Sequence, residues 1–200
     1  MVQDVSEMLW PLLGSALHVV MERGETEGWT SEERLFTEVD GVTVSGAIDL
    51  QERTAGGVAI VDYKFTSAWA VMNEKIEWEQ QLNCYAWLVE KVTGQQVTDL
   101  GIVAIIRDWS SREAKQKDSY PQAPIVVIDI PLWSFEDREQ YVRNRIHVHT
   151  EAFFEDETGG EIAPCTPEEM WEKPTTWAVK KIGGVRAKSV HTTKEEAELM

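Results

Sequence analysis

The sequence predicts an α/β protein in which a central mixed β-sheet is flanked by helices. In residues 34–65, hydrophobic and polar residues alternate with a period of two, which is typical of half-buried strands. Two short aliphatic runs further along the chain have the length and composition of buried strands. Between and around these strands, apolar residues recur at helical spacing in three segments: 9–23, 78–92 and 135–154.

The first expected helix, residues 9–23, carries an apolar stripe on one face and Gly14, His18 and Glu22 on the other. Pro11 implies that the regular turns begin near Leu9 or are kinked there. The following period-two region predicts a three-stranded meander, because Asp40-Gly41 and Gly56-Gly57 are turn sequences. Its expected strands are residues 35–39, 42–50 and 58–65.

The second helix is expected to end at Gly94, since glycine commonly terminates helices. We expect residues 100–107 and 125–130 to be strands buried on both faces. The polar residues 108–124 between these strands predict a mobile loop. Residues 135–154 then predict a long third helix.

The C-terminal part differs in charge from the rest. Residues 151–172 hold eight acidic residues and no basic one, whereas residues 173–191 hold five bases and no acid. A Gly183-Gly184 turn predicts a hairpin, and a capping box of Thr193 and Glu196 predicts a final helix. We therefore expect three regions, and whether the chain is a trimmed form of a longer protein stays open, since the last helix is cut at residue 200. The regions are a core over 1–155, an acidic linker or covering loop over 156–172, and a hairpin with the start of a helix over 173–200.

Composition excludes several classes of protein. The 200 residues carry a formal charge of −16, which argues at first sight against a nucleic-acid binder. The longest apolar runs are far below the roughly 20 residues of a membrane span. Because the first residues are acidic and the chain has only two cysteines, we expect no secretory signal, no disulfide scaffold and a cytoplasmic location.

Candidate catalytic residues lie at the ends of two expected neighbouring strands. Asp62 and Lys64 point to the same side of an extended chain, and Asp49 ends the adjacent strand. Two carboxylates on adjacent strands suit a hard divalent cation such as Mg²⁺ or Mn²⁺, which would polarise a phosphoryl oxygen and activate water. Lys64 is then expected to orient or deprotonate that water. By itself, an Asp-x-Lys sequence is usually a solvated strand face.

Four motifs follow one another along the chain. They are Gly14…His18, Gly46-Ala47-Ile48-Asp49, Asp62-Tyr63-Lys64 and Gln81-Leu82-Asn83-Cys84-Tyr85. In these motifs and their order, the chain resembles the PD-(D/E)XK nuclease superfamily. The likeness is greatest to its RecB-like exonuclease branch, which includes CRISPR adaptation nucleases and phage-encoded exonucleases. The resemblance covers residues 9–92 and implies a restriction-endonuclease-like core that carries the C-terminal hairpin as an appendage.

The resemblance implies a metal-dependent DNA nuclease, acting as an exonuclease in phage or bacterial recombination, repair or processing. Lys64 would be the catalytic lysine, Gln81 would hold Lys64 or the scissile phosphate, and Tyr85 would orient the site or contact the strand. Glu22 would bind a second ion or only orient the first ligands, and both alternatives stay open. One or two Mg²⁺ or Mn²⁺ ions would be held by His18, Asp49, Asp62 and the carbonyl of Tyr63.

Some members of this branch hold an iron–sulfur cluster with four cysteines. This chain has only Cys84 and Cys165, so we expect no cluster. No phosphate-loop sequence of a helicase motor is present, so any unwinding of DNA would come from a helicase or recombination partner. For the DNA itself, the sequence suggests a local basic track despite the acidic total. Its candidate residues are Lys115, Lys117, Arg143, Arg145, Lys180, Lys181, Arg186 and Lys188.

Two rival functions remain at this stage. The first is a module that kept the nuclease fold without its catalysis and binds DNA or docks a protein. The second is a metal hydrolase acting on a small phosphoester, which would leave Gln81 and the basic hairpin without a role. Strand polarity, substrate strandedness and oligomeric state are not specified by the sequence.

Overall fold

The computed structural model describes residues 12–16, 19, 27–73, 75–167, 169–170 and 172–199. The chain divides into two compact units, residues 1–149 and 150–200, and each is described by itself. The division falls inside a helix, α5, that runs from Phe135 to Thr158. The three regions predicted from the sequence, with their boundaries at 155 and 172, stay a prediction.

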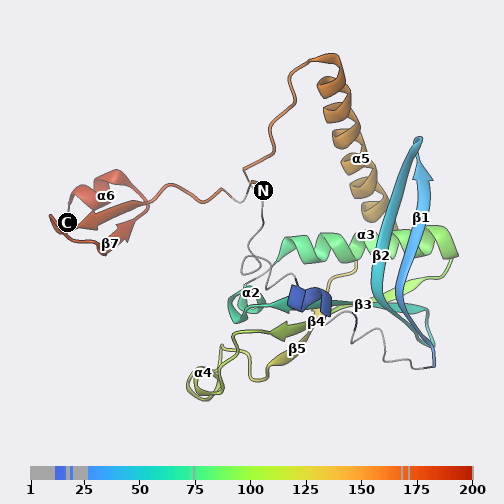
Figure 1. Ribbon diagram of the computed structural model, residues 1–200, viewed down its shortest axis with the longest axis horizontal. Helices are drawn as coiled ribbons and strands as arrows, with labels where there is room; N and C mark the ends of the chain where they lie inside the picture. The colour runs from blue at the N-terminus through green and yellow to red at the C-terminus, as the bar shows by residue number, and fades with distance from the viewer. Residues whose placement is uncertain are drawn as a thin grey trace. The chain divides into compact units, whose positions relative to one another are not determined.

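The first unit is built on a five-stranded mixed sheet with helices packed against it, as predicted (Figure 1). The strands lie in the sheet in the order β1-β2-β3-β4-β5, which is also their order along the chain. The elements of this unit, besides α5, are β1 (Trp29–Val39), β2 (Val42–Arg53), β3 (Val58–Thr66), α2 (Ala68–Met72), α3 (Ile76–Thr93), β4 (Val97–Ile106), α4 (Ser111–Gln116) and β5 (Ile125–Ile130).

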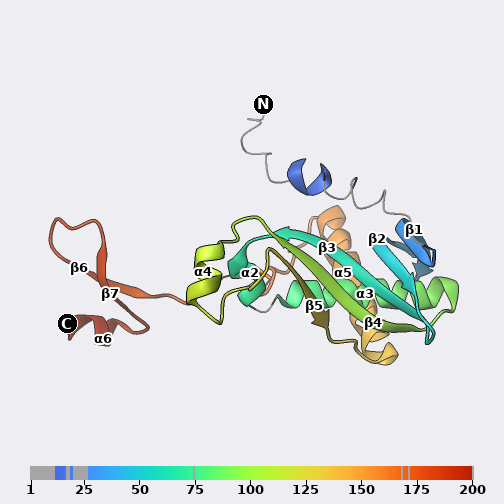
Figure 2. The same cartoon turned by 90° about the horizontal axis from the view of Figure 1, so that it is seen from below.

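Strands β1, β2 and β3 form the predicted antiparallel meander. Asp40 and Gly41, with φ of 51° and 80°, make the tight turn that joins β1 to β2. The chain then crosses over through α2 and α3, so that β4 pairs with β3 in parallel, and β5 returns antiparallel to β4. Figure 2 shows β3, β4 and β5 side by side.

Helix α3 closes the main core, because its apolar side packs against the sheet. Leu82 and Trp87 of α3 and Ile48, Ile60 and Ile102 of the strands are fully buried in this core. Gly94 ends the helix as predicted, in the left-handed conformation with φ of 69°. A single helix thus spans the strands that carry the candidate catalytic residues.

The prediction that residues 125–130 are buried on both faces is wrong. Strand β5 is the last strand of the sheet, and Ile125 and Val127 on its outer face are 54% and 71% exposed. The equally apolar β4 is inside the sheet and is largely buried. Composition alone did not distinguish the edge strand from the inner one.

Residues 108–124, predicted to be a loop, contain the short helix α4 and a second, smaller core. Tyr120 is buried there with Ala68 and Ile106, and its hydroxyl accepts a hydrogen bond from the backbone of Ser110 at 3.0 Å. The indole nitrogen of Trp109 donates to the carbonyl of Pro121 at 2.8 Å. These contacts fold the segment back on itself.

Helix α5 is attached to α3 by buried polar contacts. The side chain of Asn83 donates to the carbonyl of Pro131 and accepts from the backbone of Trp133, in the segment that leads into α5. Arg138 of α5, only 4% exposed, forms an ion pair of 3.0 Å with Glu90. The helix extends four residues beyond the predicted residue 154.

The second unit contains the predicted hairpin and final helix. Strands β6 (Trp177–Lys180) and β7 (Ala187–His191) pair antiparallel, and α6 (Lys194–Glu198) follows. The Thr193 hydroxyl caps α6 by accepting from the backbone of Glu196 at 3.3 Å, as the capping box predicted.

The predicted helix over residues 9–23 lies largely outside the described residues, and so do His18 and Glu22. In the part of the chain that the structure does describe, no helix has the length and apolar character needed to cross a membrane.

Candidate functional site

The candidate site lies where strands β2 and β3 stop pairing with each other. Their antiparallel register ends at the pair Leu50 and Val61, and Asp49 and Asp62 are the next residues on either strand. A side-chain oxygen of Asp49, Oδ2, accepts a hydrogen bond of 2.8 Å from the backbone nitrogen of Tyr63. This bond holds the Asp49 carboxylate against the strand that carries Asp62 and Lys64.

Asp62, Lys64 and Gln81 form a connected polar network between β3 and α3. The Lys64 ammonium lies 2.7 Å from Oδ2 of Asp62 and donates to Oε1 of Gln81 at 2.9 Å. The Gln81 amide nitrogen donates to Oδ1 of Asp62 at 3.2 Å. Because Asp62 is only 2% exposed, its charge depends on these partners, and the contacts fix the ammonium in position.

Tyr85 extends the network by one turn of α3. Its hydroxyl accepts a hydrogen bond of 2.9 Å from the amide nitrogen of Gln81. Burial raises the pKa of Tyr85; the hydrogen bond from Gln81 acts against this rise, and the nearby charges of Asp62 and Asp49 add to it. The phenol therefore keeps its proton at neutral pH and has that proton to donate.

Gly46 lets α3 approach β2 at this point. A Cβ atom at residue 46 would lie 2.9 Å from a ring carbon of Tyr85 and 3.2 Å from Leu88 Cδ2. Contacts below 3.0 Å do not persist between packed carbon atoms, so any side chain here pushes the Tyr85 ring away. The glycine of the Gly-x-x-Asp motif thus has a packing reason that the sequence did not reveal.

We expect Gly46→Ala to lower the free energy of unfolding by about 1–3 kcal/mol, the usual cost of overpacking. Urea unfolding would measure the change. Gly101→Ala is the matched control, because a Cβ at this other strand glycine meets nothing closer than the Ile128 carbonyl at 3.8 Å. Equal stability of the two variants would contradict the close approach of α3.

The donor set of the site fits a hard divalent cation. Asp49 and Asp62 offer carboxylate oxygens from neighbouring strands, and the backbone carbonyl of Tyr63 lies between Asp62 and Lys64 in sequence. Within the described ranges, no group of three or more His, Cys, Asp or Glu side chains is gathered. The remaining ligands implied by the resemblance, His18 and Glu22, lie outside the described residues.

Several of the predicted DNA-binding bases have acidic partners. Arg143 lies 2.7 Å from Asp40 and 2.8 Å from Glu139, and Lys117 lies 2.6 Å from Glu113. Lys115 is on α4 and Arg145 on α5. Lys180, Lys181, Arg186 and Lys188 belong to the hairpin of the second unit. A role of these residues in DNA binding stays a prediction.

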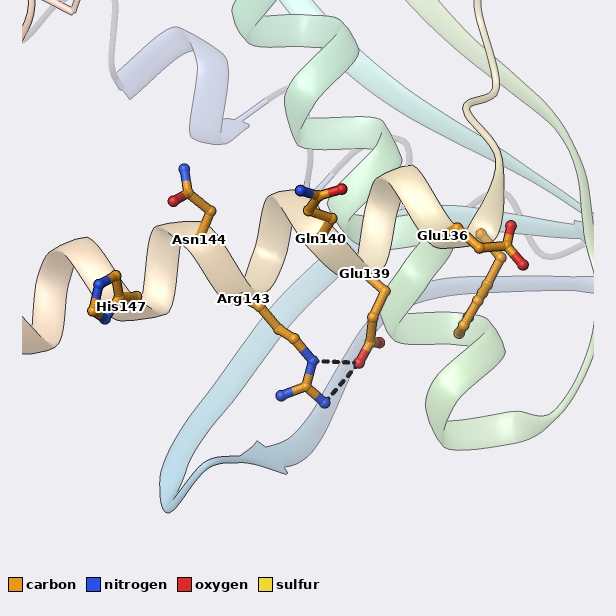
Figure 3. Close-up of a pocket in the computed structure, with 7 residues that line it drawn as sticks. Glu136, Glu139, Gln140, Arg143, Asn144 and His147 are labelled. Carbon is orange, nitrogen blue, oxygen red and sulfur yellow. Dashed lines mark hydrogen bonds and ion pairs between the residues drawn. The ribbon is translucent and has the colours of Figure 1, made fainter.

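A separate hollow of about 620 Å³ lies along α5 and is lined by residues of that helix from Phe135 to His147. Figure 3 shows its polar side chains, with Glu139 and Arg143 joined to each other. Burial alone would raise the pKa of Glu139, but hydrogen bonds from Trp87 and Arg143 outweigh it and lower the pKa below its usual value. Because Trp87 belongs to α3, these contacts hold α5 against that helix.

The two cysteines differ in environment. Cys84 lies within the helix motif, where burial raises the pKa of its thiol to about 11, while Cys165 is exposed in the second unit. That the chain holds no iron–sulfur cluster stays a prediction.

Sequence reasoning missed Arg34 of β1. The register places this exposed residue opposite Ala47, two residues before Asp49, and its guanidinium donates to the Ser45 hydroxyl at 3.2 Å. Its positive charge acts on Tyr85 by lowering the pKa of the phenol, against the larger effect of burial. Only the pairing of β1 with β2 brings this cation to the site.

Two solved structures are similar to the chain over most of its length. Among solved structures, the chain is similar to one titled SSO0001, with 17% identity over 72% of this chain and 61% of that one, and a TM-score of 0.45. It is also similar to a putative exonuclease from Eubacterium rectale, with 14% identity over 71% of this chain and 47% of that one, and a TM-score of 0.36. The chain therefore spans less than two thirds of either protein.

No curated protein matches the chain. The model of one family, the PD-(D/E)XK nuclease superfamily, matches residues 5–169. This match takes in most of the chain, including the strands and helix that carry Asp49, Asp62, Lys64, Gln81 and Tyr85. The chain belongs to the PD-(D/E)XK nuclease superfamily.

Proposed function

We propose that this chain is a metal-dependent deoxyribonuclease of the RecB-like branch, which hydrolyses phosphodiester bonds and works from DNA ends. The observation that carries the proposal is the network of Asp62, Lys64, Gln81 and Tyr85 beside Asp49. A buried carboxylate whose paired ammonium is also held by a third side chain is an arrangement typical of functional sites, where charged groups are kept in place for a substrate.

Each residue of the network has a distinct task in the proposed reaction. Asp49, Asp62 and the Tyr63 carbonyl would hold Mg²⁺ or Mn²⁺, which supplies Lewis-acid stabilisation of the developing phosphate charge. Lys64 is restrained by Asp62 and Gln81. It donates a hydrogen bond to the scissile phosphate, or it orients or deprotonates the attacking water. Tyr85 holds Gln81 and offers its own proton to a phosphate oxygen.

The distribution of charge is compatible with a DNA substrate. Residues 1–100 carry 17 acidic and 6 basic residues, and residues 101–200 carry 18 and 13, so the acidic excess is uneven. With bases concentrated in short segments, we expect DNA binding that is weak, dependent on metal and sensitive to salt. A role in phage or bacterial recombination, repair or DNA processing, with a helicase or recombination partner, is part of the proposal.

Purified protein is expected to cleave linear DNA with Mg²⁺ or Mn²⁺ and to stop when EDTA removes the metal. Closed circular DNA and end-labelled single and double strands, run in parallel, separate exonuclease from endonuclease action. Cleavage of circles at the rate of linear DNA would contradict action from ends, and cleavage that persists in EDTA would contradict metal dependence.

Calorimetry separates the nuclease from a module that kept only the fold. We expect Mn²⁺ binding that Asp49→Ala abolishes, because this substitution removes a carboxylate from the proposed ligand set. Asp129→Ala, which removes a carboxylate from the edge strand β5, is the matched control and should bind Mn²⁺ normally. Equal binding by both variants would favour the non-catalytic module.

A competition assay separates the nuclease from a small-phosphoester hydrolase. If the chain is a nuclease, added DNA should inhibit its cleavage of a small phosphodiester.

A further inference from the structure

Trp69 is an exposed aromatic residue held in a fixed position close to the site. It lies on α2, the short helix that directly follows the catalytic strand β3, and is 60% exposed. Its neighbours Ala68 and Ala70 are buried, so the helix is anchored through small residues while the indole projects outward. An indole that is exposed to water leaves a large apolar surface unburied and adds nothing to a core. Such a ring is well suited to contact a binding partner.

The helix that carries Trp69 is fixed at both ends. At its start, the backbone nitrogen of Ala68 donates to Asp108 Oδ1 at 2.7 Å, and Ser67 caps the helix by accepting from Ala70. At its end, the side-chain amide of Asn73 donates to the carbonyl of Trp69 at 2.7 Å. The indole is therefore presented on a backbone that needs little ordering when a partner binds.

A cation lies over the Trp69 ring. The Lys75 ammonium lies 5.0 Å from the centre of the Trp69 ring, a cation–π contact that occupies one face of the indole. Arg107, exposed just beyond β4, is joined to the start of this segment by its backbone, whose nitrogen donates to the carbonyl of Thr66 at 2.9 Å. A planar ring with an ammonium on one face is complementary to an unpaired base that carries a phosphate.

Trp69 lies close enough to Lys64 for one strand of nucleic acid to contact both residues. Trp69 follows Lys64 by five residues, so their Cα atoms are at most about 17 Å apart at the rise of an extended chain. Apolar surface continues past the indole, since Met72 and Ile76 are half exposed and line a hollow of about 430 Å³. A strand that reaches Lys64 would thus have its bases within reach of the indole.

We infer that Trp69, backed by Lys75, is a stacking platform for an unpaired base of the nucleic acid that enters the site. This inference rests on the proposed function and adds a preference for single-stranded or frayed ends. Trp78 and Trp109, which follow Trp69 in the sequence, pack instead against the two cores. Burial thus selects one tryptophan from three.

Binding of a labelled single-stranded oligo-dT to the full chain, measured by fluorescence anisotropy at low salt with Ca²⁺ in place of Mg²⁺ and with the oligonucleotide checked on a gel to be intact, tests the inference apart from cleavage. We expect Trp69→Ala to weaken binding by about 5- to 150-fold, the range that one base–aromatic stack supplies. Trp69→Phe should retain most of the affinity. Phe36→Ala, which removes an aromatic of similar exposure (58%) from β1, should leave it unchanged.

An oligonucleotide of abasic sites gives the decisive comparison, because it keeps the phosphates and removes the bases. The wild type and Trp69→Ala should bind it equally. The inference would be overturned if Trp69→Ala bound oligo-dT as tightly as the wild type, or if its affinity for the abasic strand fell by the same factor as for oligo-dT. Trp69 would then contact a protein partner or serve only the fold. The cleavage assay with metal is a separate readout, so failure of the proposed function would be visible independently.

Discussion

Lys64→Ala is expected to reduce DNA cleavage by about 10²–10⁴-fold, the contribution of a positioned proton-transfer group. The ammonium lies at the centre of the network and contacts both Asp62 and Gln81, so its removal takes away the charge that these two side chains hold in place. Asp62→Ala should be at least as severe, because it removes a proposed metal ligand together with the partner of Lys64. Single-turnover cleavage of end-labelled linear DNA in Mn²⁺ measures both.

Gln81→Ala offers a graded test of the same network. Gln81 touches Lys64, Asp62 and Tyr85 without supplying charge, so its loss should leave residual cleavage above that of Lys64→Ala. Lys91→Ala is the matched control. It removes an ammonium near the end of the same helix, α3, that lies 3.7 Å from Glu139, and the variant should cleave normally. Full activity of both Asp62→Ala and Lys64→Ala would refute the assignment of the site.

The largest effect on stability is expected for Arg138→Ala. This guanidinium is buried and pairs with Glu90, whose other oxygen accepts from the backbone nitrogen of Val97 at 2.9 Å. Removing Arg138 leaves the Glu90 charge largely buried without its counterion, which costs about 3–5 kcal/mol. Urea unfolding followed by circular dichroism would give this difference.

A double variant tests the reason for the loss. In Glu90→Gln/Arg138→Met, no buried charge is left and the glutamine still accepts from Val97, so most of the lost stability should return. Lys117→Ala removes an exposed ion pair and should change stability little. If the double variant were no more stable than Arg138→Ala, packing of the arginine side chain, and not its charge, would account for the effect.

The periodic spacing of apolar residues was sufficient to predict the helices and strands that bury only one face. The meander and helix α3 follow directly from apolar spacing and from the turns at Asp40-Gly41 and Gly94. It was insufficient for α2, which is too short to show a helical period, and for α4, whose residues are polar. Both short helices are held by contacts with distant residues, such as Asp108 with Ala68, that no local pattern contains.

The candidate site shows the same division. The motifs identified Asp49, Asp62, Lys64, Gln81 and Tyr85 as candidates, and the structure brings them together because β2 and β3 part where α3 crosses them. Arg34 was missed, because its place beside the site depends on strand register.

Alternation, helical spacing and motif order are local properties of a chain, and they were enough to predict the class of fold and the residues of the candidate site. The folded structure was needed to show which apolar strand is the edge, why residue 46 must be glycine, and which tryptophan is left exposed near the site. Those answers depend on which side chains distant in sequence fill the same space, and that is set by packing.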